Sequence, residues 1–98
     1  MTVEKTRNGA SLTVRVAGRL DASNAKLLSE ELGNSLDGVS ELTIELSELE
    51  YISSAGLRVL LSAQKIMNQQ GAMKVAGVRE TVMEFFEAAG FRTLMNFV

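Results

Sequence analysis

The spacing of the hydrophobic residues changes several times along this 98-residue chain, from every second residue to every third or fourth and back. A spacing of two, which is typical of strands with one buried face, occurs over residues 11–16 and 41–46. Shorter segments predict further strands at residues 73–76 and 94–98, and residues 3–7 are a weaker candidate next to the turn signal at Asn8-Gly9. The sequence therefore predicts several strands, which are separated by segments with a different spacing of hydrophobic residues.

Three segments with helical spacing separate these strands. The apolar stripe of the first segment consists of Ala25, Leu28, Leu32 and Leu36. The second segment covers residues 55–70, and the third covers residues 82–89. Gly71 and Gly90 follow these two segments, at positions where a left-handed residue ends a helix at low cost.

Asp21 is the expected N-cap of the first helix. Its side chain can accept a hydrogen bond from a free N–H group of the first turn, and Ser23 and Asn24 compete for the same role. Such a cap would start the helix directly after the loop formed by residues 18–21.

The order of these elements predicts an α/β fold. Asn8-Gly9 is a hairpin signal that pairs residues 3–7 with residues 11–16 in an antiparallel manner. Strands that alternate with helices favour right-handed crossovers and parallel pairing. We therefore expect a single domain over residues 1–98, with a mixed β-sheet, helices packed on it and the order β-β-α-β-α-β-α-β.

The composition excludes several kinds of chemistry. The chain has no His and no Cys, which removes imidazole bases, thiol nucleophiles, disulfides and His/Cys zinc sites. Its formal charge of −2 argues against nucleic-acid binding. The longest hydrophobic run, Val59–Leu61, is far shorter than the ~20 residues that cross a bilayer, and the N-terminus lacks the apolar core of a secretory signal. We expect a cytoplasmic protein without metal, cofactor or membrane insertion.

The segment 49–57 is the most informative part of the chain, because two adjacent hydroxyl groups, those of Ser53 and Ser54, lie where a helix begins. A helix N-terminus favours a phosphate or a carboxylate, since its N–H groups and dipole carry partial positive charge. A simpler interpretation is that one of the two serines only caps the helix. Gly56 in the first turn costs about 0.5 to 1 kcal/mol relative to Ala, which indicates close approach by a backbone, either a partner's or this chain's own.

Residues 51–61, which read YISSAGLRVLL, resemble the signature of STAS domains, specifically of the bacterial anti-sigma factor antagonists. Residues 18–21 resemble that family's first loop, and residues 87–91 resemble the end of its third helix, so the resemblance spans nearly the whole chain. It implies the STAS fold and a protein that binds an anti-sigma factor, which is also a serine kinase. Binding would free a sigma factor for transcription.

The resemblance also implies a phosphorylation switch. In that family the kinase phosphorylates a serine at this turn and inactivates the antagonist, and a metal-dependent serine phosphatase reverses the modification. The usual family pattern is Asp-Ser-Ser/Ala-Gly-Leu, with the first serine after the Asp modified. Carried onto this chain, the phosphoacceptor is Ser54, and Ser53 stands in place of the Asp. Ser53 is the second candidate, because it is itself a hydroxyl next to the expected acceptor.

A partner surface is implied around the same turn. Asp21 resembles a family position in a loop beside the turn, where partner contacts are made, and this role can coexist with that of an N-cap. The residues expected to bind the partner are Asp21, Ser53, Ser54, Gly56, Leu57, Arg58 and Leu61.

The second helix carries two apolar strips. The expected core strip consists of Val59, Ala63, Ile66 and Met67. Leu57 and Leu61 lie apart from it and share a mixed strip with Gln64 and Asn68. This mixed strip is either a contact surface or a sign that the helix is buried on more than half its circumference. In the third helix, Phe85 and Phe86 both have the spacing of core residues.

Two other functions remain open. An enzyme that used Ser54 as a nucleophile would need a base, but the chain has no His, no Ser-x-x-Lys pattern near Ser54 and no Gly-x-Ser-x-Gly elbow. A chain of this length also leaves little room for an enclosed pocket of ~300 Å³, so we expect a protein that is not an enzyme. The alternative is an unswitched accessory subunit of a transport or signalling complex, since STAS domains also occur in lipid-transport complexes and attached to anion transporters.

Overall fold

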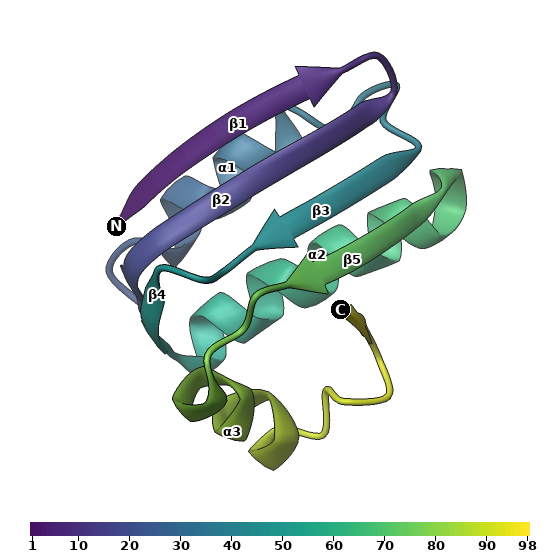
Figure 1. Cartoon of the computed structure of the whole chain (residues 1–98). Coiled ribbons are helices and arrows are strands. Elements are labelled where there is room, and N and C mark those ends of the chain that lie inside the picture. Colours follow the sequence, from purple (N-terminus) through teal and green to yellow (C-terminus); the bar gives the residue numbers. More distant parts are fainter.

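One mixed sheet organises the molecule, in a computed structural model that describes residues 1–98 (Figure 1). Its strands run in the order β1-β2-β3-β5-β6, and β4 pairs separately with β2. The strands are β1 (Thr2–Asn8), β2 (Ser11–Leu20), β3 (Glu41–Glu45), β4 (Leu49–Ile52), β5 (Ala72–Ala76) and β6 (Asn96–Phe97). Only β1 and β2 pair in an antiparallel manner, and all other pairs are parallel. The α/β class and the mixed sheet are therefore confirmed.

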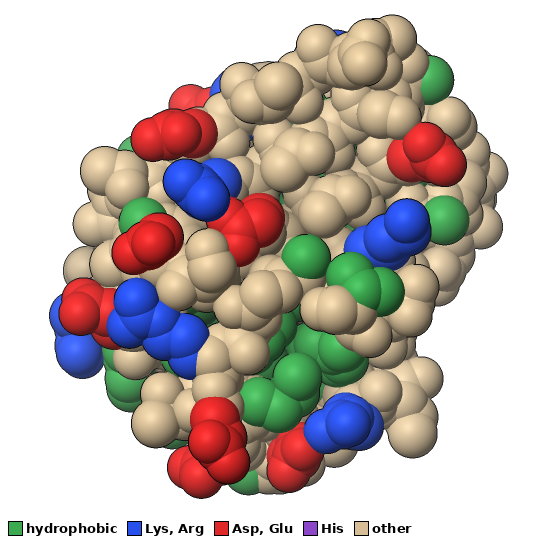
Figure 2. Space-filling model, in the orientation of Figure 1, with side chains coloured by type: hydrophobic (Ala, Val, Ile, Leu, Met, Phe, Trp, Pro, Cys, Tyr) green, Lys and Arg blue, Asp and Glu red, His purple; other side chains and the backbone are tan.

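Three helices accompany the sheet. They are α1 (Ala25–Gly33), α2 (Ser54–Gln70) and α3 (Glu80–Ala88). Figure 1 shows α1 and α2 side by side behind the strands, whereas α3 lies at the end of the sheet near β4. The other face of the sheet carries no helix, and Figure 2 shows mainly polar and charged side chains over β1, β2 and β3. None of the three helices has both the length and the apolar character needed to cross a membrane.

The buried face of the sheet follows the alternation of the sequence. Leu12, Val14 and Val16 of β2 are buried, and their neighbours in β3, Leu42 and Ile44, are buried on the same face. Together with side chains from all three helices they form a core of 24 buried residues. The two-residue turn after Asn8 closes the predicted hairpin, with Asn8 opposite Ser11.

The fourth strand was missing from the predicted order, which contained one strand where the structure has β3 and β4. β4 has only four residues, and it pairs with an extension of β2 that continues to Leu20, well past the predicted end at Val16. A register shift between Gly18 and Arg19 separates this extension from the regular part of β2. The strand thus depends on a pairing between distant segments, and a local alternation of residues does not reveal it.

The first helix also begins and ends differently from the prediction. Asn24 occupies the N-cap position of α1, and Asp21 lies one turn earlier. Leu36 is buried, as expected, but it follows the end of α1 and contributes to the core from a turn.

Gly71 closes α2 as predicted, but not for the predicted reason. Its φ is 171°, which is extended backbone and not the left-handed region. A Cβ atom at this position would lie 1.9 Å from the backbone oxygen of Ser40, and the same oxygen accepts a hydrogen bond from the N–H of Ala72. Gly71 is required because the start of β5 passes directly over the chain that enters β3. Gly90, with a φ of +76°, does adopt the left-handed conformation.

Candidate functional site

The ends of β2 and β4 bring the predicted loop and the predicted turn together. Leu20 lies opposite Ile52 in the parallel pairing, and the N–H of Ser53 donates to the backbone oxygen of Leu20 over 2.9 Å. Asp21 directly follows Leu20, and Ser54 directly follows Ser53. Asp21 and the turn that begins α2 therefore lie next to each other, as expected.

Ser53 and Ser54 have different environments at the start of α2. Ser53 is the N-cap, and its Oγ accepts a hydrogen bond from the N–H of Gly56 at 3.4 Å. Ser53 is half-buried, whereas Ser54, the first residue of the helix, is exposed. The first turn of α2 contains no acidic residue, so the positive end of the helix dipole is not neutralised there.

Gly56 is buried and is needed by the fold of this chain itself. A Cβ atom at Gly56 would lie 2.7 Å from Cγ of Leu20 and 2.9 Å from Cγ1 of Ile52. The first turn of α2 thus packs directly on the ends of β2 and β4. The close approach at this glycine is made by side chains of this chain itself, and a contact between Gly56 and a partner stays a prediction.

Asp21 organises its loop instead of capping α1, which corrects the expected N-cap. Its Oδ1 accepts hydrogen bonds from the N–H of Ser23 at 3.0 Å and from the hydroxyl of Ser23 at 2.6 Å. The Asn24 side chain accepts from the N–H of Asp21 and donates to the backbone oxygen of Arg19, each at 2.9 Å. The hydrogen bonds from Ser23, assisted by the charge of Arg19, lower the pKa of the Asp21 carboxyl group.

An aromatic and cationic cluster lies beside this loop, and the sequence interpretation missed it. The guanidinium of Arg19 lies 4.3 Å from the ring centroid of Tyr51, to which Arg19 is paired across β2 and β4. The rings of Tyr51 and Phe85 meet edge to face, with centroids 5.4 Å apart. Phe85 is 41% exposed, whereas Phe86 is fully buried, so the expectation that both phenylalanines belong to the core is wrong for Phe85.

The only sequence signal for this cluster was the position of Tyr51 three residues before Ser54. Its pairing with Arg19 depends on β4, which was not predicted. Phe85 reaches Tyr51 only because α3 packs on β4.

The exposed and buried faces of α2 differ from the predicted strips. The buried positions are Gly56, Leu57, Leu60, Ala63, Gln64 and Met67. Ile66 of the expected core strip is 42% exposed, and Leu57 of the mixed strip is buried. Leu61 is half-buried, and Arg58, one turn after Ser54, is exposed. Of the mixed strip, Leu57 and Gln64 are thus buried, Leu61 is half-buried and Asn68 is exposed, so the strip is divided between the interior and the surface.

Of the seven residues expected to bind a partner, only Ser54 and Arg58 are exposed. Asp21, Ser53 and Leu61 are half-buried, while Gly56 and Leu57 are buried. The chain contains no cluster of acidic side chains that could hold a metal ion. The accessible part of the site is thus the exposed start of α2 together with the loop after β2, and the cluster of Arg19, Tyr51 and Phe85 lies on the adjoining ends of β2 and β4 and on α3.

Comparison with known proteins agrees with this architecture. Residues 3–96 match the family model described as "Mlab, STAS domain". A candidate anti-sigma factor antagonist, BtrV of Bordetella bronchiseptica, is 38% identical over 79 residues, which cover 79% of this chain and 68% of BtrV. The anti-sigma-B factor antagonist of Bacillus subtilis is 26% identical over 98% of this chain and 89% of its own length.

The fold is shared with solved structures as well. The crystal structure of an anti-sigma factor antagonist from Mycobacterium paratuberculosis superimposes with a TM-score of 0.88 at 21% identity, over 98% of this chain and 83% of that chain. The family model covers nearly all of the residues, and the strand order and helices give the same fold. The resemblance noted in the sequence is confirmed, and this chain belongs to the STAS domain family.

Proposed function

We propose that this protein is an anti-sigma factor antagonist whose binding is switched off by phosphorylation of Ser54. In this role it binds an anti-sigma factor that is also a serine kinase, and it thereby releases a sigma factor in the cytoplasm. The observation that carries the proposal is the different use of the two adjacent serines: Ser53 is engaged as the helix cap, and Ser54 is exposed beside the Asp21 loop.

The geometry favours Ser54 over Ser53 as the phosphoacceptor. A kinase must reach the hydroxyl oxygen, and Ser53 is a half-buried residue whose Oγ already accepts a hydrogen bond from the N–H of Gly56. A phosphate on Ser53 would also remove the cap, at a cost of about 0.5 to 2 kcal/mol. Modification of Ser54 leaves this hydrogen bond in place.

The start of α2 can tolerate a phosphate without unfolding. A phosphoserine adds about −1.5 to −2 charges at neutral pH, and its interaction with the helix dipole is favourable by about 0.3 to 1 kcal/mol. Arg58, one turn further along the helix, is an exposed cation on the same side as Ser54. The first turn of α2 itself contains no acidic residue that would repel the phosphate.

A partner seated on the same surface would not tolerate that phosphate. A dianion that loses its water in an interface without a cationic partner costs about 2 to 5 kcal/mol. This cost corresponds to a loss of affinity of about 30-fold or more. The modification therefore acts on binding and not on folding, and a serine phosphatase can reverse it because Ser54 stays exposed.

The cluster of Arg19, Tyr51 and Phe85 gives this surface an anchor beside the switch. Exposed aromatic and arginine side chains contribute strongly to protein interfaces. Phe85 exposes about two fifths of its surface and is held in position by Tyr51. A partner that covers both Ser54 and Phe85 gains apolar contact area at Phe85. Phosphorylation of Ser54 then displaces this partner, because it adds negative charge to the interface.

The test is to treat the protein with ATP and the candidate anti-sigma factor kinases of its genome. Mass spectrometry of the parent, Ser53→Ala and Ser54→Ala locates the phosphate, and calorimetry measures kinase binding before and after modification. We expect one phosphate on the parent and on Ser53→Ala, none on Ser54→Ala, and weaker binding of the phosphorylated protein. Phosphate on Ser53 alone would contradict the assignment, and a phosphoprotein that melts at a much lower temperature would show a switch that acts through unfolding.

The alternative function is an unswitched accessory subunit of a transport or signalling complex. This alternative predicts tight binding to a transport or signalling component without any phosphate transfer. The same experiment separates the two functions, because only the switch requires both ATP and the Ser54 hydroxyl.

A further inference from the structure

β1 is an edge strand of seven residues that nothing in the chain covers on its outer side. It pairs only with β2, whereas β6, at the opposite edge of the sheet, has only two residues. The pairing of β1 with β2 runs without a register shift from Thr2 opposite Ala17 to Asn8 opposite Ser11. The continuous register shows no bulge in this edge, and the chain contains no proline that could interrupt it.

Alternate residues of β1 direct their backbone groups away from β2. The two-residue turn makes Asn8 and Ser11 a hydrogen-bonded pair, and hydrogen-bonded pairs then alternate along the ladder. The N–H and C=O groups of Val3, Lys5 and Arg7 therefore point outward. A row of three such residues can bind an extended peptide as an added strand.

The charged side chains of this strand are held by other parts of the chain. The Nζ of Lys5 donates to Oε2 of Glu31 at 2.6 Å and to the hydroxyl of Ser35 at 3.1 Å. The guanidinium of Arg7 donates to the backbone oxygens of Gly9 and Asp37. Both side chains thus stay on the face of the sheet that carries α1, and the outer backbone groups remain accessible.

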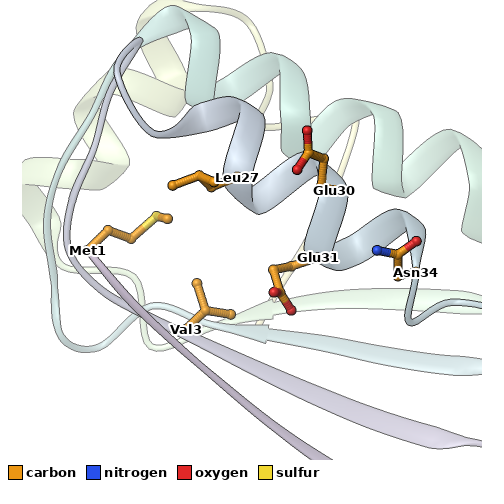
Figure 3. A pocket seen from close by; sticks show the side chains of 6 residues that line it. All are labelled: Met1, Val3, Leu27, Glu30, Glu31 and Asn34. Atoms are coloured by element: carbon orange, nitrogen blue, oxygen red, sulfur yellow. The ribbon is translucent and has the colours of Figure 1, made fainter.

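A hollow of about 330 Å³ with a mixed lining, three apolar and three polar side chains, lies beside the first half of this edge (Figure 3). The side chains of Met1, Val3 and Leu27 point into the space between β1 and α1, and Leu27 is 59% exposed. Glu30 and Glu31 lie at the rim of the hollow. Glu31 already pairs with Lys5, whereas Glu30 makes no ion pair within the chain. The hollow is therefore suited to an apolar side chain that has a cationic neighbour.

Pairing of β1 with a second copy of itself is unfavourable. Two copies of β1 that pair in an antiparallel manner are related by a two-fold axis. Residues directly opposite each other in such a pair point to the same face, so an axis near the middle of β1 passes through either Glu4 or Lys5. The first arrangement places Glu4 opposite Glu4, and the second places Lys5 opposite Lys5. Like charges directly opposite each other destabilise a strand pair. The charges of β1 thus favour a different chain.

We propose that β1 is a docking edge that binds an extended segment of another protein as an additional strand. An apolar side chain of that segment fills the hollow of Met1, Val3 and Leu27, and a neighbouring Lys or Arg, two residues away on the same face, pairs with Glu30. This inference goes beyond the proposed function, because it does not involve Ser54.

The probe that tests this inference is a capped peptide with the sequence Thr-Lys-Thr-Leu-Thr-Lys-Thr, titrated into the full-length chain and followed by the amide resonances of the protein. The Leu and both Lys side chains of the peptide share one face, and their N–H groups are the ones that meet Val3, Lys5 and Arg7. We expect saturable shifts at these residues and at Leu27. A peptide with an N-methylated Leu lacks the central donor and should bind about tenfold more weakly.

Two substitutions of Lys5 form a matched pair. Lys5→Ala and Lys5→Pro both lose the ion pair with Glu31, but only Lys5→Pro also loses the outward N–H, which takes no part in the pairing with β2. We expect Lys5→Ala to bind the peptide as the parent does and Lys5→Pro to bind it at least about tenfold more weakly. Should Lys5→Pro fail to fold, the N-methylated peptide tests the same contact on the parent protein.

Three results would overturn the inference. The first is the absence of saturable shifts along β1 with millimolar peptide, and the second is equal binding of the N-methylated peptide. The third is self-association of the parent that Lys5→Pro abolishes, which would make β1 an interface between copies. If the kinase does not phosphorylate Ser54, the proposed function is contradicted, but the inference that β1 binds a peptide is not affected.

Discussion

The backbone N–H of Ser53 donates to the backbone oxygen of Leu20 over 2.9 Å, and this hydrogen bond joins the end of β4 to the end of β2. Because of it, the exposed serine that follows Ser53 lies beside the loop of Asp21. The side chains of Leu20 and Ile52 also form the surface on which Gly56 packs. Ser54, the Asp21 loop and the start of α2 thus meet at one corner of the molecule, and each can be tested by substitution.

Gly56→Ala should destabilise the protein, although alanine is the better helix former. The gain in helix propensity is at most about 1 kcal/mol, and the added methyl group would lie 2.7 Å from Cγ of Leu20. Overpacking of this kind typically costs about 1 to 3 kcal/mol. Urea unfolding measures the difference. The matched control is Gly33→Ala, where a Cβ atom meets nothing within 4 Å, and this variant should be as stable as the parent or more stable.

Ser53→Ala and Ser54→Ala should differ in stability as well as in phosphorylation. Loss of the Ser53 cap should lower the free energy of unfolding by about 0.5 to 2 kcal/mol. Ser54→Ala removes an exposed hydroxyl and should change it by less than about 0.5 kcal/mol. Ser54→Asp should keep the fold and weaken kinase binding. Equal stability of the two alanine variants would show that the Ser53 cap contributes little.

Phe85→Ala should weaken binding of the anti-sigma factor by tenfold or more, which is about 1.4 kcal/mol, with a smaller effect on folding. The ring is 41% exposed and rests on Tyr51 beside the Ser54 turn. The control is Leu94→Ala, which truncates a side chain that is 50% exposed and lies outside the proposed surface. Calorimetry with the anti-sigma factor compares the two, and equal losses would remove Phe85 from the interface.

Asp21 should make the stability of the protein depend on pH in the acid range. Its pKa in the folded state is lowered, so the ionised carboxylate is favoured by folding. The stabilisation is fully present above the pKa of the unfolded chain and is lost as the pH falls through the pKa of the folded state. Asp21→Ala should therefore be less stable than the parent at pH 7, and the difference should shrink toward pH 3. A difference that stays constant with pH would mean that Asp21 acts through packing alone.

Asp21→Ala should also weaken partner binding more than it weakens folding. The Asp21 carboxylate organises the loop beside Ser54 through Ser23, and this loop forms part of the proposed surface. Calorimetry and urea unfolding of the same variant give both quantities at pH 7. Unchanged affinity together with lower stability would restrict Asp21 to a structural role.

Local patterns in the sequence predicted most of the secondary structure. The alternation in β2 and β3 and the helical spacing of α1, α2 and α3 reflect which side chains face the core, and that information is periodic along the chain. The hairpin at Asn8 follows from the turn residues themselves. The motif around Ser54 indicated the family, because its residues are contiguous in sequence, whereas the phosphorylation switch stays a prediction.

Contacts between distant segments were decided only by the tertiary structure. β4 is too short to show a period, and it exists because the extension of β2 supplies its partner. Phe85 and Phe86 are adjacent in α3, and both have the spacing of core residues. Phe85 nevertheless contacts Tyr51 at the surface, because α3 packs on β4. Gly71 is a glycine because of Ser40, 31 residues away. Periodicity shows which side of a helix or strand is apolar. It does not show which other element packs on that side, because this depends on the tertiary structure. The candidate site consists of residues that such packing brings together.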